Sequence, residues 1–205
     1  MKTRNLLVLP VFAAFALRVF GQPTFLYDQQ SAVEGANAES AAGITPSQPF
    51  GQSFTPMFDS VGFIRLWLIE GNPGNGTGAT VFVNLRSNSI TGPILAASDL
   101  VFLPDGFGPP GNRGYPDFFF TNPVPVTPGV TYYFQPVIQS GDGVVAFTEN
   151  TYHYSGGNAF YQGLAAPNND LWFREGVVVP EPSSIALILL GGGIGFYVRR
   201  NLHQK

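Results

Sequence analysis

The sequence predicts an all-β fold, an antiparallel β-sandwich of the jelly-roll type. Short stretches of alternating apolar and polar residues, rich in Val, Phe, Tyr and Thr, recur between residues 48 and 178. Clusters of Gly, Pro, Asn and Asp separate these stretches, as expected for turns. This region has no apolar stripe at helical spacing, and only 11% of all residues are charged, against about 25% in a typical soluble domain. A long solvated helix or coiled coil is therefore excluded.

Alternation assigns the strands in order. In 61–69, Ile64, Leu66 and Leu68 share one face, and the odd-numbered residues, including Val61 and Trp67, share the other. In 80–86 the apolar odd-numbered residues point inward. Further strands are expected at 48–54, 94–98, 117–121, 130–139, 144–148, 158–161 and 170–178, with turns at 71–78, 104–116, 128–129 and 141–143. Eight or more such strands indicate a sandwich domain, which we place at 22–178.

The N-terminus has the pattern of a secretory signal peptide. Two basic residues precede an apolar run from Leu6 to Leu17, and a small residue, Gly21, follows. The run is too short for a comfortable membrane span. We expect the secretion machinery to export the chain and signal peptidase to cut between Gly21 and Gln22, with a cut near Ala16 as the alternative.

The C-terminal segment, 179–205, combines three unlike features. Pro180, Glu181 and Pro182 interrupt regular structure, and the uncharged stretch at about 183–198 predicts a short transmembrane helix of roughly 24 Å. Arg199 and Arg200 open a basic tail, 199–205, that is expected to stay in the cytoplasm. The domain would then lie outside, attached to the inner membrane.

This order of features resembles the PEP-CTERM sorting signal of Gram-negative bacteria. The resemblance implies recognition by an exosortase, a membrane-embedded transpeptidase, which removes the tail. The protein would pass through an inner-membrane intermediate to the cell surface or extracellular matrix. A membrane anchor that is never cut is the alternative.

The domain also resembles the sandwich modules that PEP-CTERM surface proteins often carry. The resemblance covers Gly-Gln-Ser-Phe-Thr-Pro at 51–56, Val-Phe-Val at 81–83, Val-Thr-Pro-Gly-Val-Thr-Tyr-Tyr at 126–133 and Asp-Leu-Trp-Phe-Arg at 170–174. Similar signatures occur in noncatalytic jelly-roll modules related in shape to carbohydrate-binding domains. These are strand and turn residues, so they support the fold more than any activity.

Charge and residue chemistry narrow the possible functions. Residues 22–178 contain four Arg, no Lys and 12 acidic residues, a net charge of −8, which disfavours nucleic acid as a partner. The chain has no Cys, and His153 is the one histidine before the tail, so a catalytic triad or a histidine metal site is not expected. We therefore expect no enzyme and no required cofactor.

Three kinds of site stay open. Paired carboxylates could serve a glycan hydrolase or lyase, and the candidates are Glu70, Asp117, Glu149 and Glu175. Structural calcium is possible at Asp142, or at Asp170 after Asn168 and Asn169, although turn formation explains both clusters. A polysaccharide-binding surface would need exposed aromatic rings beside polar groups. Alternation favours exposure of Trp172 over Trp67, and its candidate neighbours are Tyr115, Tyr152, Tyr154 and Tyr161.

The sequence thus predicts an exported, noncatalytic cell-surface or matrix protein. A carbohydrate-binding module for extracellular polysaccharide is the first alternative, and a carboxylate-based glycan hydrolase or lyase is the second.

Overall fold

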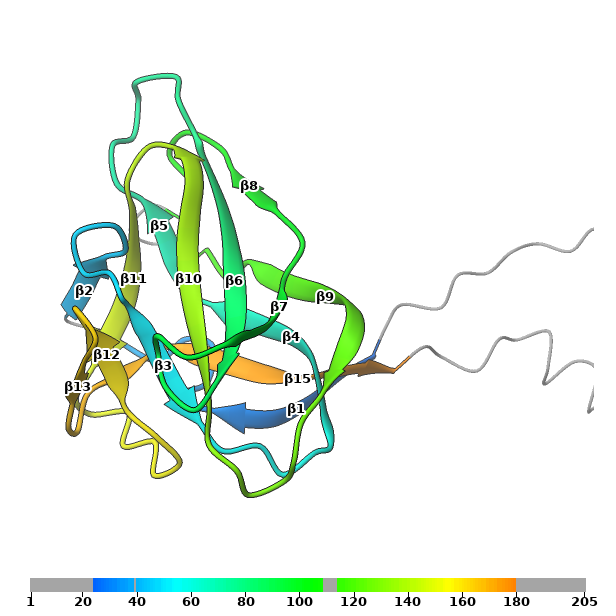
Figure 1. Cartoon of the computed structure of the whole chain (residues 1–205). Helices are drawn as coiled ribbons and strands as arrows, with labels where there is room; N and C mark the ends of the chain where they lie inside the picture. Colours follow the sequence, from blue (N-terminus) through cyan, green and yellow to red (C-terminus); the bar gives the residue numbers. More distant parts are fainter. Residues whose placement is uncertain (1–23, 39, 109–113, 180–205) are drawn as a thin grey trace, which may run out of the picture. The chain divides into compact units, whose positions relative to one another are not determined.

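A computed structural model of the chain describes residues 24–38, 40–108 and 114–179 (Figure 1). In these ranges every regular element is a β-strand, and all strand pairs are antiparallel. None of these residues forms a helix long and apolar enough to cross a membrane. The predicted signal peptide, sorting motif, membrane helix and basic tail lie outside the described residues.

Two large sheets form the sandwich. The first has the order β1-β15-β4-β9, and the second has the order β13-β12-β3-β10-β6-β7, with β8 also paired to β6 (Figure 1). The strands of the first sheet are β1 (Thr24–Gln30), β15 (Phe173–Val179), β4 (Ser60–Leu66) and β9 (Asp117–Pro125). Those of the second are β13 (Leu164–Ala166), β12 (Ala159–Tyr161), β3 (Gly51–Phe54), β10 (Tyr132–Gly141), β6 (Ala79–Ser87), β7 (Ile94–Ala97) and β8 (Val101–Leu103).

The strand order is that of a jelly roll. Numbered along the chain, the eight strands β1, β3, β4, β6, β7, β9, β10 and β15 give the orders 1-8-3-6 and 2-7-4-5 in the two sheets. The first and last strands are therefore neighbours, with Thr24 opposite Val179. The predicted jelly-roll sandwich is confirmed.

A smaller sheet is formed around β11 (Val144–Glu149). This strand pairs with β2 (Ser40–Gly43), β5 (Leu68–Glu70) and β14 (Asp170–Leu171). The chain passes from β4 to β5 at Trp67 and from β14 to β15 at Trp172. The predicted single strands at 61–69 and 170–178 are thus each divided between two sheets at a tryptophan.

The core lies between the facing sheets. The predicted inward residues Val81, Val83 and Leu85 are fully buried in it, together with the even-numbered Ile64 and Leu66. Val61, from the odd-numbered face, also lies in this core, and the register of β4 and β9 shifts between Val61 and Phe63.

Pro136 lies inside β10, in the middle of the second sheet, although proline lacks the N–H that a ladder uses. Its carbonyl accepts a hydrogen bond from the Gln48 side chain at 2.7 Å, so its backbone polar groups face away from β6. The pairing of β10 with β3 ends at Phe134, so the missing donor falls beyond the ladder.

Candidate functional site

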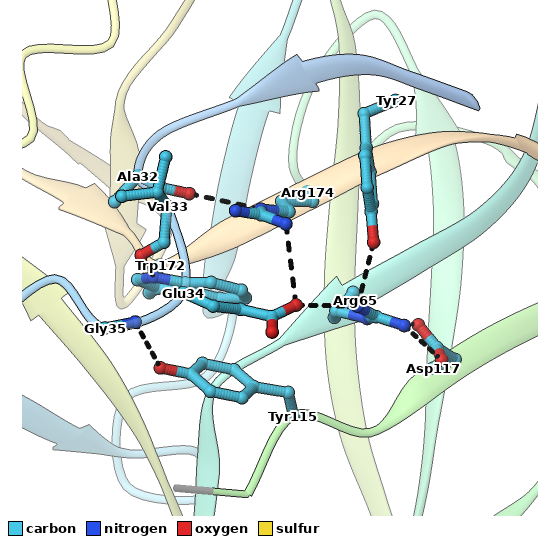
Figure 2. Close-up of polar contacts among 10 residues, drawn as sticks. All are labelled: Tyr27, Ala32, Val33, Glu34, Gly35, Arg65, Tyr115, Asp117, Trp172 and Arg174. Carbon is cyan, nitrogen blue, oxygen red and sulfur yellow. Dashed lines mark hydrogen bonds and ion pairs between the residues drawn. The ribbon is translucent and has the colours of Figure 1, made fainter. Parts of the chain in front are cut away.

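An arginine network covers the outer face of the first sheet (Figure 2). Arg174, Arg65 and Asp117 lie directly opposite one another on β15, β4 and β9. Arg65 binds Asp117 through two hydrogen bonds, Nε to Oδ1 at 2.6 Å and Nη2 to Oδ2 at 2.8 Å. Its Nη1 donates to Tyr27 Oη at 2.8 Å and to Glu34 Oε1 at 2.7 Å. These partners use every nitrogen of the guanidinium group, and the bond to Asp117 raises the pKa of Arg65 above its ordinary value.

Glu34 belongs to a segment that crosses over this face. The Arg174 side chain donates to Ala32 O at 3.3 Å and lies 3.5 Å from Glu34 Oε1. Ser31 Oγ donates to Leu171 O and accepts from Phe173 N. Residues 31–35 are therefore held on β15 from several sides.

Trp172 lies beneath this segment, so the prediction that it is exposed is wrong. Only 1% of the residue is accessible, its Nε1 donates to Val33 O at 3.2 Å, and its ring lies 4.4 Å from that of Tyr115 (Figure 2). Alternation assigned Trp172 to the correct face, since Arg174 contacts its ring. Alternation contains no information about the segment that covers that face, and a buried ring cannot stack on a glycan.

Tyr115 is likewise engaged in contacts within the protein. Its hydroxyl accepts a hydrogen bond from Gly35 N at 3.4 Å, and its ring also faces Trp67, which stacks on Phe147 at 3.9 Å. Trp67 is 7% exposed, as the sequence predicted for a buried residue. These rings form a structural cluster under residues 31–35, separate from the main core.

The four predicted carboxylates have different surroundings. Glu70 accepts hydrogen bonds from Asn72 N and Gly106 N, and Asp117 binds Arg65. Glu149 accepts from Asn150 N at 2.8 Å. Each of these three carboxylates thus binds either nearby backbone N–H groups or an arginine side chain.

Glu175 is the exception, because its residue is 0% exposed inside the sandwich. Burial, and then the charge of Asp28, raise the pKa of Glu175 to about 9. Asp28 itself accepts hydrogen bonds from Met57 N at 2.7 Å and Phe58 N at 2.8 Å. These two carboxyls form a pair that sequence reasoning did not find, but Glu175 has no surface from which a polymer could reach it.

Asp142, the first calcium candidate, accepts a hydrogen bond from the Asn75 side chain, which joins two loops. Asp105 binds the loop that contains Asn75. Its carboxylate accepts hydrogen bonds from Gly74 N at 2.7 Å and Gly76 N at 2.8 Å, and these bonds lower the pKa of Asp105. Within the described ranges, no three His, Cys, Asp or Glu residues are grouped to hold a metal ion.

Asp170, the second calcium candidate, lies at a polar pocket of about 400 Å³. The residues that line this pocket are His153, Tyr154, Ser155, Gly157, Asn158, Asn168 and Asp170. Asp170 Oδ1 accepts from Gln52 Nε2 at 2.8 Å, and Oδ2 accepts from Tyr154 N at 2.9 Å. Three residues that the sequence singled out for separate reasons, His153, Tyr154 and Asp170, thus meet at one pocket.

The tyrosines near this pocket are bound to the protein itself. Tyr154 Oη accepts from Thr55 N and donates to Gln29 Oε1, and its ring packs edge-on against Phe173. Burial raises the pKa of Tyr154 to about 12. Tyr161 donates to Asn169 Oδ1 at 2.8 Å, and Tyr152 is half-buried. The aromatic platform of Trp172 with tyrosines, which the sequence left open as an alternative, is therefore not formed.

Sequence reasoning missed Ser155 and Asn158 in the pocket, and Tyr27 and Glu34 in the arginine network. Alternation and motif patterns carry no signal for these residues, because long-range pairing brings them to their sites.

Comparison with known proteins adds one finding. Residues 178–201 match the PEP-CTERM protein-sorting motif. The match begins at Val178, which still pairs with Phe25 in the first sheet. A search of curated proteins found no match to the chain.

The fold and the motif together define an exported all-β protein with a C-terminal sorting signal. The chain carries the PEP-CTERM motif, which marks it as a substrate for an exosortase, directed to the cell surface or the extracellular space.

Proposed function

We propose that this chain is a noncatalytic surface or matrix protein of a Gram-negative-type bacterium. After signal peptidase acts between Gly21 and Gln22, the C-terminal segment holds the protein at the inner membrane. An exosortase then cuts at the Pro180–Glu181–Pro182 motif, and the sandwich domain is released to the cell surface or the extracellular matrix.

The observation that carries this proposal is the position of the matched motif. It starts at the last two residues of β15, where Thr24 pairs with Val179. A cut after Val179 therefore removes no strand and leaves both large sheets intact. The sorting segment is an appendage to a domain that is complete without it.

The surroundings of the acidic residues support a noncatalytic role. Asp117 is bound to Arg65, and Glu175 is enclosed in the core. A glycosidase needs two carboxyl groups that both reach the substrate. Degradation of the host's own polysaccharide by the purified protein, abolished by replacing one carboxylate, would overturn this part of the proposal.

Intact mass tests the sorting step. The protein is recovered from cells and medium of strains with and without the exosortase, and the Glu181→Ala variant is compared with Asp59→Ala, a control at an exposed loop carboxylate. We expect loss of the C-terminal segment only with the exosortase present, reduced processing in Glu181→Ala and normal processing in Asp59→Ala. A tail that stays uncut in every strain would instead identify a permanent membrane anchor.

A further inference from the structure

The polar pocket at Asp170 is a concave site that the sorting function does not use. It lies between the loop that joins β11 to β12 and the loop that joins β13 to β14. Its volume of about 400 Å³ falls within the range of about 300–1,000 Å³ that is usual for small-molecule sites. A single sugar unit fits a site of this size.

Asp170 is fixed at this site. The residue is 2% exposed, and its two oxygens accept from Gln52 on β3 and from Tyr154 N. Gln52 in turn accepts from Leu171 N through its Oε1, so the carboxylate and its amide partner hold each other in position. Each carboxylate oxygen has further lone-pair capacity beyond these bonds.

The rim contains more accessible groups. His153, Ser155 and Asn168 are exposed, and Asn158 is half-buried. His153 and Asn168 have left-handed backbone conformations, with φ of 52° and 64°. Such conformations are uncommon for residues other than glycine and recur at ligand sites.

The lining indicates the chemistry of a ligand. Two side-chain amides, a hydroxyl and an imidazole offer both donors and acceptors, and a carboxylate adds acceptors. Sugar hydroxyls also donate and accept, so they match this set. No Lys or Arg lines the pocket, and Asp170 would repel an anion, which disfavours acidic sugars and phosphates. The one aromatic residue, Tyr154, packs its ring on Phe173, so the site suits hydrogen bonding to one unit better than stacking along a chain.

We propose that this pocket binds a neutral sugar unit, such as the end or a branch of an extracellular polysaccharide. The inference adds a partner to the proposed function but does not depend on the tail being cut. Its test reads binding, whereas the sorting test reads mass, so failure of one is distinguishable from failure of the other.

The test titrates the full-length protein, in a detergent without a sugar head group, with methyl glycosides of glucose, galactose, mannose and N-acetylglucosamine. Glucuronic acid and calcium chloride form separate arms. Binding is followed by calorimetry and by the NMR signals of the His153 ring, which are distinguished from those of His203 by a His203→Gln variant. We expect saturable binding of at least one neutral glycoside, with a shift of the His153 signals.

Asn168→Gly removes an amide from the pocket while allowing the same backbone conformation. Asn88→Gly is the matched control, since Asn88 has a φ of 68° in a loop outside the lining. A second pair is His153→Gly with Gln162→Gly, at φ of 52° and 51°. We expect the pocket variants to bind about three- to tenfold more weakly and the controls to bind normally.

Three results would overturn the proposal. They are the absence of binding by every neutral glycoside, equal effects of the pocket and control variants, and a response to calcium or glucuronic acid that the neutral glycosides do not produce.

Discussion

Glu175 places a carboxyl group in the interior of the sandwich, where desolvation and the charge of Asp28 oppose its ionisation. Its pKa rises from 4.5 to about 9. Between these values the unfolded chain has lost a proton that the folded protein still holds. The stability that this group contributes is therefore complete below the unfolded pKa and is lost as the pH rises toward 9, by at most about 1.4 kcal/mol per pH unit.

Glu175→Gln keeps the size and polarity of the side chain but cannot titrate. We expect the free energy of unfolding of the unmodified protein to fall between about pH 5 and pH 9, and this slope to be much smaller in the variant. Urea denaturation across this range measures it. Asp59→Asn, an exposed carboxyl-to-amide change, should keep the slope. Identical slopes in Glu175→Gln and the unmodified protein would contradict the assignment.

Arg65 joins three elements through one side chain, so its removal should cost more than a surface ion pair. Arg65→Met leaves Asp117, which is 19% exposed, without its bidentate partner, and it removes the shorter of the two ion pairs of Glu34, whose longer pair with Arg174 remains. We expect a loss of about 2 kcal/mol in the free energy of unfolding and increased exposure of Trp172 to a fluorescence quencher.

Arg86→Met serves as the control for this change. Arg86 donates to Gln135 Oε1 and Gly92 O, with no carboxylate among these partners. The Arg86→Met variant should leave the quenching of Trp172 fluorescence unchanged. Equal quenching in the two variants would show that the Arg65 network does not hold residues 31–35 over the tryptophan.

At the scale of elements, the pairing of β1 with β15 depends on Gly176. A Cβ at this position would overlap the carbonyl oxygen of Leu26, a backbone atom that cannot move without disturbing the ladder. We expect Gly176→Ala to destabilise the protein by about 2–3 kcal/mol, measured by chemical denaturation. Gly143→Ala, where a Cβ meets nothing within 4 Å, should change stability little. A tolerated Gly176→Ala would show that β1 can shift on β15.

Strands in which apolar and polar residues clearly alternate were predicted from the sequence. Strands that form mainly because they pair with another strand were not. The strand at 80–86 is confirmed as β6, because its apolar residues recur at every second position. β2 contains Ser-Ala-Ala-Gly, which has little strand preference, and is held by its pairing with β11.

The candidate sites show the same limit. Asp170 and its preceding asparagines attracted notice as a local cluster, but Gln52 and Asn158, which come from elsewhere in the chain, complete their surroundings. For Trp172 the sequence predicted the correct face of the strand but the wrong exposure. The reason is that residues 31–35, which are distant in sequence, cover that face. Local pattern fixes direction, whereas burial depends on contacts between distant segments.

At the scale of the whole molecule, the first strand forms an edge of the first sheet and pairs with the last strand. Residues 24–179 form one compact unit, and its two ends meet at the pair Thr24 and Val179. We expect a chain of residues 22–179 to unfold at the same urea concentration as the exosortase-processed protein. A chain that begins at Ser31 lacks β1 and should unfold at a clearly lower concentration. Equal midpoints for these two truncated chains would contradict a stabilising role for β1.

The place of β15 also determines how the domain bears mechanical load. This strand lies between β1 and β4 (Figure 1), pairing with β1 from Arg174 to Val179 and with β4 from Phe173 to Gly176. A pull on its C-terminal end therefore acts along a strand that is bonded to β1 at that end and to both neighbours further in. The ladder hydrogen bonds run across the strands, so such a pull shears many of them at once. A pull between the two chain ends would instead open the β1–β15 ladder one bond at a time. A domain that is tethered by its C-terminus alone is thus loaded in the direction in which the β1–β15 ladder resists better than when both chain ends are pulled apart.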